Sequence, residues 1–241
     1  KGLTTGGLIL LLLIPTIFIT HLIEEREKRH QEVVQEVSAR WANPQTIASP
    51  YIIVPYTETS LNHEGKPVQH TQPLVLFSKH LTVQGEVFPE TRARSIYTIL
   101  LYRSHLQLSG TFKPQWPSDI KKEQLQLDQA RICFGIGDYK GVEKEIRIRF
   151  GQQSIELSPG VPAEVFKQPG LSAPVPLTIE QLEEGINFDM DVSLKGSGKL
   201  HFLPISSNSS FQLKSNWHSP SFDGNNLPNQ RKVDATGFTA S

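Results

Sequence analysis

The chain has 241 residues, and its 24 basic and 24 acidic residues cancel to a formal net charge of +0 at pH 7. This balance leaves no global field that would draw the protein to nucleic acid, so we expect no nucleic-acid partner. The single cysteine, Cys133, excludes an intrachain disulfide, and a domain of about 200 residues is large enough to be stabilised by its core alone.

The first element is apolar and long. Residues 3–23 read LTTGGLILLLLIPTIFITHLI, without one formally charged side chain. At about 1.5 Å per residue, about 20 helical residues cross the roughly 30 Å hydrocarbon core of a bilayer. We therefore predict a transmembrane helix over residues 1–23, with residues 3–23 in contact with membrane lipid. A cleaved signal peptide would need a small-x-small site directly after this run, and a buried core helix would not need so many uncharged residues.

A polar helix is predicted over residues 24–43, before Pro44. Glutamates that precede a basic residue by four positions stabilise it, and apolar residues recur at helical spacing on one side. We expect a rigid stalk that continues the first helix and packs this stripe on the following domain. The charged pairs are Glu24–Lys28, Glu25–Arg29 and Glu36–Arg40, and the stripe is Val33, Val34, Val37 and Trp41.

The remainder, residues 44–241, is β-patterned. In residues 186–194, apolar side chains alternate strictly with polar ones, as in a strand with one buried and one solvated face. A short helix is predicted at Ile179–Glu184, with Thr178 as N-cap and Gly185 after its end. The fold class is mainly β, an antiparallel β-sandwich-like domain preceded by the transmembrane helix and the juxtamembrane helix. Further strands are predicted at 51–56, 74–77, 81–87, 96–102, 106–112, 131–136, 142–150, 199–202 and 210–217.

Two glycine-rich stretches do not fit phosphate-binding loops. GIGDYKG, residues 135–141, lacks the G-x-G-x-x-G spacing, so we predict a turn with Asp138 first and Gly141 fourth. KGSGK, residues 195–199, lacks the upstream glycine of a P-loop, and Gly196–Gly198 is predicted to be a hairpin turn.

The search for chemistry finds no catalytic, cofactor-binding or metal-binding residues. Asp189 and Asp191 share the predicted solvent face of their strand, the histidines lack metal-ligand spacing, and Cys133 is expected to be inert. We therefore expect a protein that is not an enzyme. The alternative is a carbohydrate-active or glycan-binding β-sandwich, with Asp138 and Glu143 or Glu145 as candidate carboxylates in an aromatic-lined pocket.

The closing segment carries a recognisable motif. SNWHSPSFDGNNLPNQRKVDATGF, residues 215–238, resembles the CreD family of inner membrane proteins, whose members carry SNW-x-x-PSF-x-G-x-x-LP-x-x-R followed by GF. Segments SPYIIVPY, IY, LSGTF, IGDYKG and LKGSGKLHFLP agree with the family as well. The chain departs from it at His218–Ser219 and Asn226. The candidate recognition or structural residues are Asn216, Trp217, His218, Pro220, Ser221, Phe222, Gly224, Leu227, Pro228 and Arg231.

The resemblance implies a protein of the bacterial inner membrane. It implies one N-terminal span, a periplasmic domain after about residue 24, and C-terminal membrane helices beyond Ser241 that the domain would meet as a partner. It fixes the orientation, which the charges around the first helix leave open. It also implies roles in cell-envelope integrity, in tolerance to certain colicins and in a two-component regulon that responds to carbon source, without an established reaction or cofactor.

The motif has two interpretations. In one, Trp217 and Phe222 anchor a loop that seals the sandwich edge, and Arg231 bonds loop carbonyls. In the other, exposed aromatics and Arg form a recognition surface for an envelope protein, a glycan or the C-terminal membrane helices. The parity of Phe211 and Leu213 predicts that Trp217 points into the core.

Overall fold

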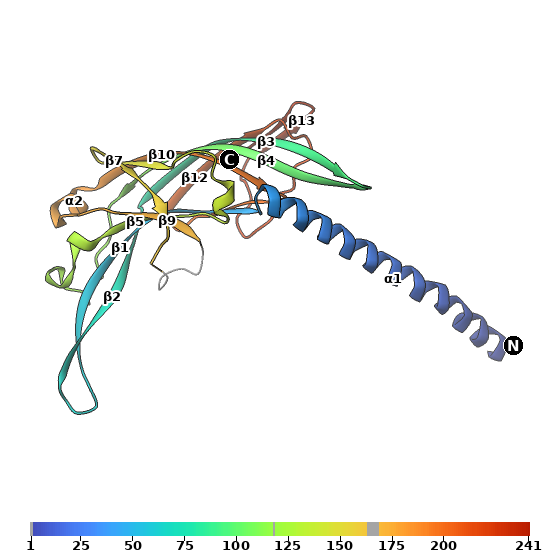
Figure 1. Cartoon of the computed structure of the whole chain (residues 1–241), viewed down its shortest axis with the longest axis horizontal. Coiled ribbons are helices and arrows are strands. Elements are labelled where there is room, and N and C mark those ends of the chain that lie inside the picture. The colour runs from blue at the N-terminus through green and yellow to red at the C-terminus, as the bar shows by residue number, and fades with distance from the viewer. Residues whose placement is uncertain (1, 118, 163–168) are drawn as a thin grey trace.

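The protein is a β-rich body with one long helix, as shown by a computed structural model that describes residues 2–117, 119–162 and 169–241. Of residues 3–5, 8–11, 13 and 14 only the backbone is described. Helix α1 projects away from the body and carries the N-terminus at its far end (Figure 1). The predicted mainly β fold with an N-terminal helix is confirmed.

Helix α1, Gly2–Trp41, is one uninterrupted helix of 40 residues that includes Pro15. The two helices predicted on either side of residue 23 are thus continuous. Among the described residues, no helix combines the length and the apolar character needed to cross a membrane. The stripe residues Val33, Val34, Val37 and Trp41 are half-buried where α1 meets the body.

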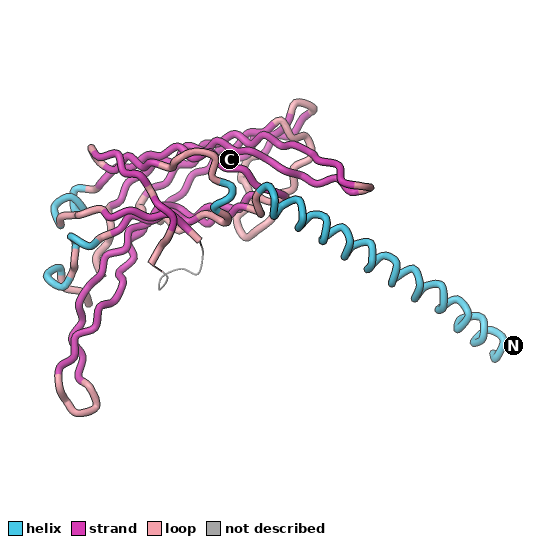
Figure 2. Tube along the Cα trace, viewed as in Figure 1, coloured by secondary structure: helices cyan, strands magenta, loops and turns pink. Residues whose placement is uncertain are grey.

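The strands form two sheets in the described part of the chain (Figure 2). The six-stranded sheet has the order β11-β1-β5-β9-β8, and β2 pairs with β1. Its strands are β1 (Gln45–Leu61), β2 (Pro67–Phe77), β5 (Arg131–Gly135), β8 (Ser158–Pro159), β9 (Gly170–Pro174) and β11 (Leu200–Leu203).

The eight-stranded sheet has the order β13-β14-β12-β3-β4-β10-β6-β7. Its strands are β3 (His80–Arg94), β4 (Tyr97–Phe112), β6 (Arg147–Phe150), β7 (Gln153–Glu156), β10 (Ile186–Ser197), β12 (Asn208–Ser215), β13 (Arg231–Asp234) and β14 (Gly237–Ala240). Short helices lie between strands: η1 (Lys122–Gln124), η2 (Leu127–Gln129), η3 (Tyr139–Gly141) and α2 (Ile179–Glu184).

One hydrophobic cluster contains residues of both sheets. Ile52 of β1 and Ile132 of β5 are fully buried in it, and so is Phe112 of β4. The ring of Phe112 lies 5.0 Å from that of Phe188 and 5.9 Å from that of Phe150 between centroids. Burial of such large side chains contributes about 1.5–3 kcal/mol each, so this shared core is the main source of stability.

The clearest sequence patterns are confirmed. Phe188, Met190 and Val192 are buried along β10, whereas Asp191 on the opposite face is exposed. Helix α2 has the predicted bounds, and the Thr178 hydroxyl accepts a hydrogen bond from the N–H of Gln181 at 3.3 Å. The strict alternation and the N-cap are local features, so they survive whatever the tertiary contacts are.

The predicted hairpin turn at Gly196–Gly198 is wrong. Strand β10 continues to Ser197, and the chain then crosses to the other sheet, where β11 pairs in parallel with β1. Strand β12 also pairs in parallel with β3, so the sheets are not wholly antiparallel as predicted. Sequence periodicity specifies which residues face inward but not which strand becomes the neighbour, and this explains the error.

Two predicted strand boundaries also need correction. The segments 96–102 and 106–112 belong to one strand, β4. The strict alternation is broken within this strand, where the neighbours Leu101 and Tyr102 are both buried, so the pattern resembles two separate strands. The strand predicted at 142–150 contains only Arg147–Phe150, and Val142 forms an isolated bridge with Leu194.

Candidate functional site

The closing motif forms an irregular loop between β12 and β13 at one edge of the eight-stranded sheet. The backbones of Gln230 and Ser241 exchange two hydrogen bonds of 2.9 Å, which close this end of the sheet. Most candidate side chains in the loop are solvent-exposed, and Leu227 retains 54% of its accessible surface. The exposed residues are Asn216, His218, Ser221, Gly224, Leu227 and Arg231, and the half-buried ones are Trp217, Pro220, Phe222 and Pro228.

The prediction that Trp217 lies in the core is wrong. Strand β12 ends at Ser215, so the parity that was extended to Trp217 no longer applies. The indole is half-buried, stacks on the ring of His218 at 5.8 Å between centroids, and donates its Nε1–H to the carbonyl of Ser219 at 2.7 Å. Trp217 therefore shapes the loop that follows it.

Phe222 and Phe238 hold the other side of the loop against β14. Their rings meet edge to face with centroids 5.5 Å apart, a favourable aromatic geometry. Within the described residues, the Arg231 side chain makes no hydrogen bond to a loop carbonyl, in contrast to the sealing interpretation, and it is exposed. The loop thus combines two aromatic anchors with an exposed leucine and an exposed arginine.

One ion pair connects the loop to the body near the base of α1. Lys199 Nζ lies 2.8 Å from a carboxylate oxygen of Asp223, and this hydrogen bond lowers the pKa of Asp223. The backbone carbonyl of Lys199 also accepts hydrogen bonds from the N–H of Gln45 at 3.2 Å and from the hydroxyl of Tyr102 at 2.8 Å. Lys199 therefore contacts both the closing motif and the start of β1.

Gln45 is the centre of this helix–domain junction. Its side chain is fully buried and makes three hydrogen bonds to backbone groups. The amide Nε2 donates to the carbonyls of Asp138 at 3.0 Å and Lys195 at 3.1 Å, and Oε1 accepts from the N–H of Asp138 at 3.1 Å. Because Gln45 follows α1 by four residues, these bonds fix where the helix leaves the body.

The two glycine-rich stretches serve this junction. A Cβ at Gly196 would lie 2.3 Å from the Tyr102 hydroxyl, and one at Gly141 would lie 2.1 Å from the amide nitrogen of Gln45. Glycine is therefore required at both positions by close approach rather than by phosphate binding. The predicted turn is confirmed, since the N–H of Gly141 donates to the carbonyl of Asp138 at 3.0 Å.

Asp138 closes the junction from the domain side. Its carboxylate accepts hydrogen bonds from the backbone N–H and the side-chain amide of Asn43, at 3.0 and 2.9 Å, and from the N–H of Lys140 at 3.0 Å. Burial raises the pKa of this carboxyl, but the hydrogen bonds outweigh burial and hold the pKa below its ordinary value. Asp138 acts here as an ionised cap rather than as a proton donor.

Trp41, the last residue of α1, is surrounded by cations. The guanidinium carbons of Arg92 and Arg103 lie 4.7 and 4.9 Å from its ring centroid, and Lys195 Nζ lies at 5.1 Å. Each such contact is worth about 0.5–1 kcal/mol at a partly exposed site. The indole Nε1 is buried with no acceptor among the described residues, so the ring is held by the cation–π contacts and by packing rather than by a hydrogen bond.

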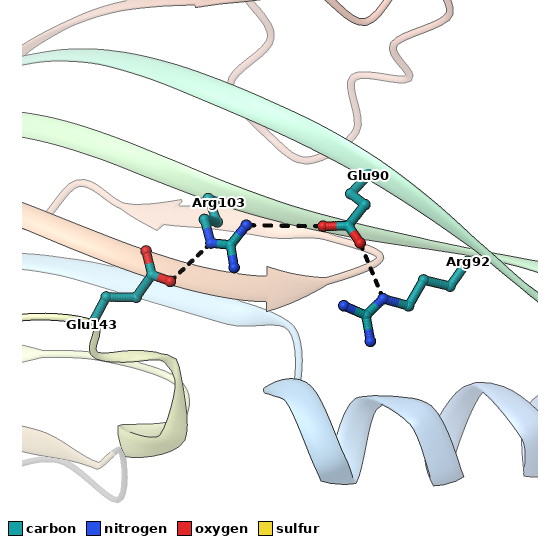
Figure 3. Close-up of polar contacts among 4 residues, drawn as sticks. All are labelled: Glu90, Arg92, Arg103 and Glu143. Carbon is teal, nitrogen blue, oxygen red and sulfur yellow. Dashed lines mark hydrogen bonds and ion pairs between the residues drawn. The ribbon is translucent and has the colours of Figure 1, made fainter.

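Two glutamates balance these cations (Figure 3). Glu90 lies 3.1 Å from Nε of Arg92 and 3.9 Å from Nη1 of Arg103. Glu143 lies 2.9 Å from Nε of Arg103. These pairs orient the guanidinium groups toward Trp41, and they join β3, β4 and the segment after η3 at the end of the helix.

Cys133 faces away from the main core, as its parity predicts, but it is fully buried. It packs in a second cluster with Tyr51 and Ile53. Burial raises the pKa of the thiol to about 12, and the nearby Arg131, which lowers this pKa, has the weaker effect. A protonated, buried thiol is a poor nucleophile, in agreement with the expectation of an inert cysteine.

Asp189 and Asp191 lie on the outer face of the eight-stranded sheet, as expected. The Asp189 carboxylate lies 2.5 Å from Nη2 of Arg149 and is paired rather than free. The two aspartates border a hollow of about 280 Å³ that also contains Glu145. Asp138 does not line this hollow. Glu143, the other carboxylate considered for a glycosidase, is paired with Arg103 at 2.9 Å.

A larger hollow, of about 630 Å³, lies across the same outer face. In-register residues of four strands, Gln212, Gln84, Gln107 and Asp191, form a polar row along it. Neither hollow is lined by Trp or Tyr. Among the described residues, no group of three or more His, Cys, Asp or Glu side chains is arranged to hold a metal ion.

Sequence reasoning missed Gln45, Tyr102 and the cations around Trp41. Their spacing in the chain carries no motif, because they come from β1, β3, β4 and β10 and meet only in the fold. The positions of Gly141 and Gly196 were the available signal. The turn reading is right for Gly141 and wrong for Gly196, and in both cases the close approach of a distant segment is not visible in the sequence.

The fold and the long helix define a β-rich domain carried on an N-terminal helix, and comparison with known proteins defines its family. The profile described as "Inner membrane protein CreD" matches residues 1–241, so the chain belongs to the CreD family. The resemblance drawn from the closing motif is thereby confirmed. An inner-membrane location follows from this membership.

A curated relative supports the same assignment. The inner membrane protein CreD of Escherichia coli strain K12 is 30% identical over 237 residues, which cover 97% of this chain and 52% of the relative. The chain therefore spans about half the length of that relative. No solved structure matches the chain.

Proposed function

We propose that this protein contributes to cell-envelope integrity and is anchored in the inner membrane by residues 3–23. In this proposal, a β-sandwich-like domain lies in the periplasm after about residue 24 and binds or senses an envelope partner. The uncharged run of residues 3–23 and membership of an inner-membrane family support the anchor. No catalytic step is part of the proposal.

The observation that carries the proposal is the connection between the closing motif and α1. Lys199 binds Asp223 of the loop through its side chain and Gln45 through its carbonyl, and Gln45 follows the last residue of α1 by four positions. A partner that displaces the loop would therefore act on the junction. The exposed ion pair between Lys199 and Asp223 is weak, about 0–1 kcal/mol. The effect of a displaced loop on α1 therefore depends on the buried hydrogen bonds around Gln45.

We place the recognition surface on the exposed part of the loop. Leu227 is 54% exposed and lies beside the exposed Asn226, which departs from the family motif. An exposed leucine with arginine and aromatic side chains nearby has the composition of a binding surface. The partner is an envelope protein, a glycan or membrane helices that follow this domain in the full-length family member.

The test compares two neighbouring substitutions, Leu227→Ser and Asn226→Ser, in a bacterium that lacks its own copy of the protein. We expect that the Leu227→Ser protein will not restore detergent resistance to this bacterium, although its melting temperature is unchanged. The Asn226→Ser protein is expected to restore detergent resistance fully. Full restoration by Leu227→Ser would reject recognition at this surface.

The anchor and its orientation need a separate test. Protease added to right-side-out spheroplasts is expected to digest the β-rich domain and leave a membrane-bound N-terminal fragment. Protection of the domain until the membrane is permeabilised would reject the periplasmic orientation. Release of an intact soluble domain would reject the anchor.

The alternative function, glycan binding, is favoured by the polar row in the larger hollow. Amide and carboxylate side chains are suitable partners for sugar hydroxyls, and Gln84, Gln107 and Asp191 line this row. Titration of the protein with soluble peptidoglycan fragments tests it. Binding that is lost in Gln107→Ala would support the alternative, and absence of binding would reject it.

A further inference from the structure

Strands β3 and β4 continue beyond the sheet as a two-stranded arm. The pairing of β12 with β3 ends at Val87, and the pairing of β10 with β4 ends at Leu101. From Arg92 to Ile99 the two strands pair with each other alone in the described part of the chain. Figure 1 shows this arm projecting on the same side of the body as α1.

The arm contacts the side of α1. The Tyr97 hydroxyl donates to the backbone carbonyl of Arg26 at 3.3 Å, and the Tyr97 ring lies 5.2 Å from the ring of His30. Nearer the body, Arg94 Nη2 lies 3.3 Å from a carboxylate oxygen of Glu36. An isolated hairpin is marginally stable in water, so these contacts hold the arm along the helix.

The contact with Arg26 places the arm beside the end of the apolar segment. Arg26 follows Ile23 by three residues, which corresponds to about 4.5 Å along a helix axis. The headgroup layer on each face of a bilayer is about 5–8 Å thick. If residues 3–23 fill the hydrocarbon core, the Tyr97 hydroxyl lies at the depth of the headgroups.

The tip of the arm carries an exposed apolar side chain. Ser95 and Ile96 form a two-residue turn, with Ser95 in a left-handed conformation at a φ of 57°. Ile96 retains 76% of its accessible surface, the largest value among the exposed large hydrophobic residues described. The segment from Thr91 to Thr98 contains two arginines and no acidic residue. Apolar, aromatic and basic side chains together are typical of a membrane interface.

We propose that the tip Ser95–Tyr97 rests in the headgroup layer of the same bilayer that α1 crosses, with Ile96 inserted toward the acyl chains. This inference rests on the anchor of the proposed function. A domain held by α1 alone tilts together with that helix relative to the bilayer, whereas a second contact with the bilayer fixes its height and tilt. The position of the tip beside the end of the apolar segment, with an exposed Ile96 and no acidic residue between Thr91 and Thr98, favours the bilayer surface as the occupant.

The experiment places one polarity-sensitive fluorophore at a time on the full chain, reconstituted in vesicles of phosphatidylethanolamine and phosphatidylglycerol. The labelled variants are Ile96→Cys at the arm tip, Ile17→Cys in the apolar segment and Leu61→Cys at the tip of the β1–β2 hairpin. Cys133 is buried and does not take the label. Leu61 is 71% exposed at the end of another long hairpin and is the matched control. Quenching by lipids brominated on their acyl chains reports insertion.

We expect quenching and a blue-shifted emission at positions 17 and 96 and neither effect at position 61. Quenching at 17 without quenching at 96 would overturn the arm contact and leave the anchor intact. Quenching at 96 without quenching at 17 would reject the anchor, and with it the proposal that the arm touches a bilayer crossed by α1. Quenching at neither position would overturn both, and equal quenching at 61 and 96 would show that the contact is not specific to the arm.

Discussion

Replacement of Gln45 by alanine tests whether the buried junction holds α1 to the domain. The substitution removes three hydrogen bonds and leaves the N–H and carbonyl of Asp138 and the carbonyl of Lys195 without this partner. Gln84→Ala is the matched control, because Gln84 is exposed on the outer face of the eight-stranded sheet. Both variants lose the same side-chain atoms.

The expected magnitude follows from burial. A buried polar group left unsatisfied costs about 1–3 kcal/mol, and the lower end applies here because the partners of Gln45 are partly buried. Three such groups and the vacated volume give a loss of about 3–5 kcal/mol in the free energy of unfolding. Each kcal/mol lowers the melting temperature of a domain of this size by about 2–4 °C, so we expect a decrease of roughly 10 °C.

Thermal unfolding of the full chain in detergent, followed by circular dichroism in the β-sheet region, measures this decrease. Gln84→Ala is expected to change the free energy of unfolding by no more than about 0.5 kcal/mol. Equal melting temperatures for the two variants would refute the reasoning, since they would mean that the bonds of Gln45 are replaced by water without cost.

The remaining predictions concern the closing motif, the outer face of the eight-stranded sheet and the loss of stability at low pH. Trp217→Ala is expected to cost about 1–2 kcal/mol, less than the 3–5 of a core tryptophan, because the ring is half-buried, whereas His218→Ala leaves the melting temperature unchanged; a core-sized loss would contradict the observed burial. Asp189→Asn with Asp191→Asn is expected to cost at most about 1 kcal/mol in denaturant unfolding and to leave the envelope phenotype intact; loss of the phenotype with an intact fold would restore an acid–base role. Because the pKa of Asp138 is lower in the folded than in the unfolded protein, its carboxylate stabilises the fold above about pH 4, and this contribution disappears as the pH falls through the folded pKa. Unfolding between pH 6 and pH 2 should therefore be less pH-dependent in Asp138→Asn, and an unchanged slope would exclude this contribution.

The sequence by itself determined the local features of this protein. Alternation with period 2 identified the inner and outer faces of β10, because side-chain direction in a strand depends only on position. The short helix α2 and the turn at Asp138 were predictable for the same reason, since caps and turns are made by neighbours in the chain. The closing motif identified the family, and the family model confirmed it.

Only the tertiary structure decided which segments meet. The Gly196–Gly198 stretch has the composition of a hairpin turn, yet the close approach of Tyr102 is what requires Gly196. Trp217 was assigned to the core by extending a strand that ends at Ser215, and strand length depends on pairing with β3 and β14. Gln45 and the cations around Trp41 carry no local signature, because hydrogen bonds and cation–π contacts between distant segments depend on three-dimensional proximity, which a periodic pattern does not encode.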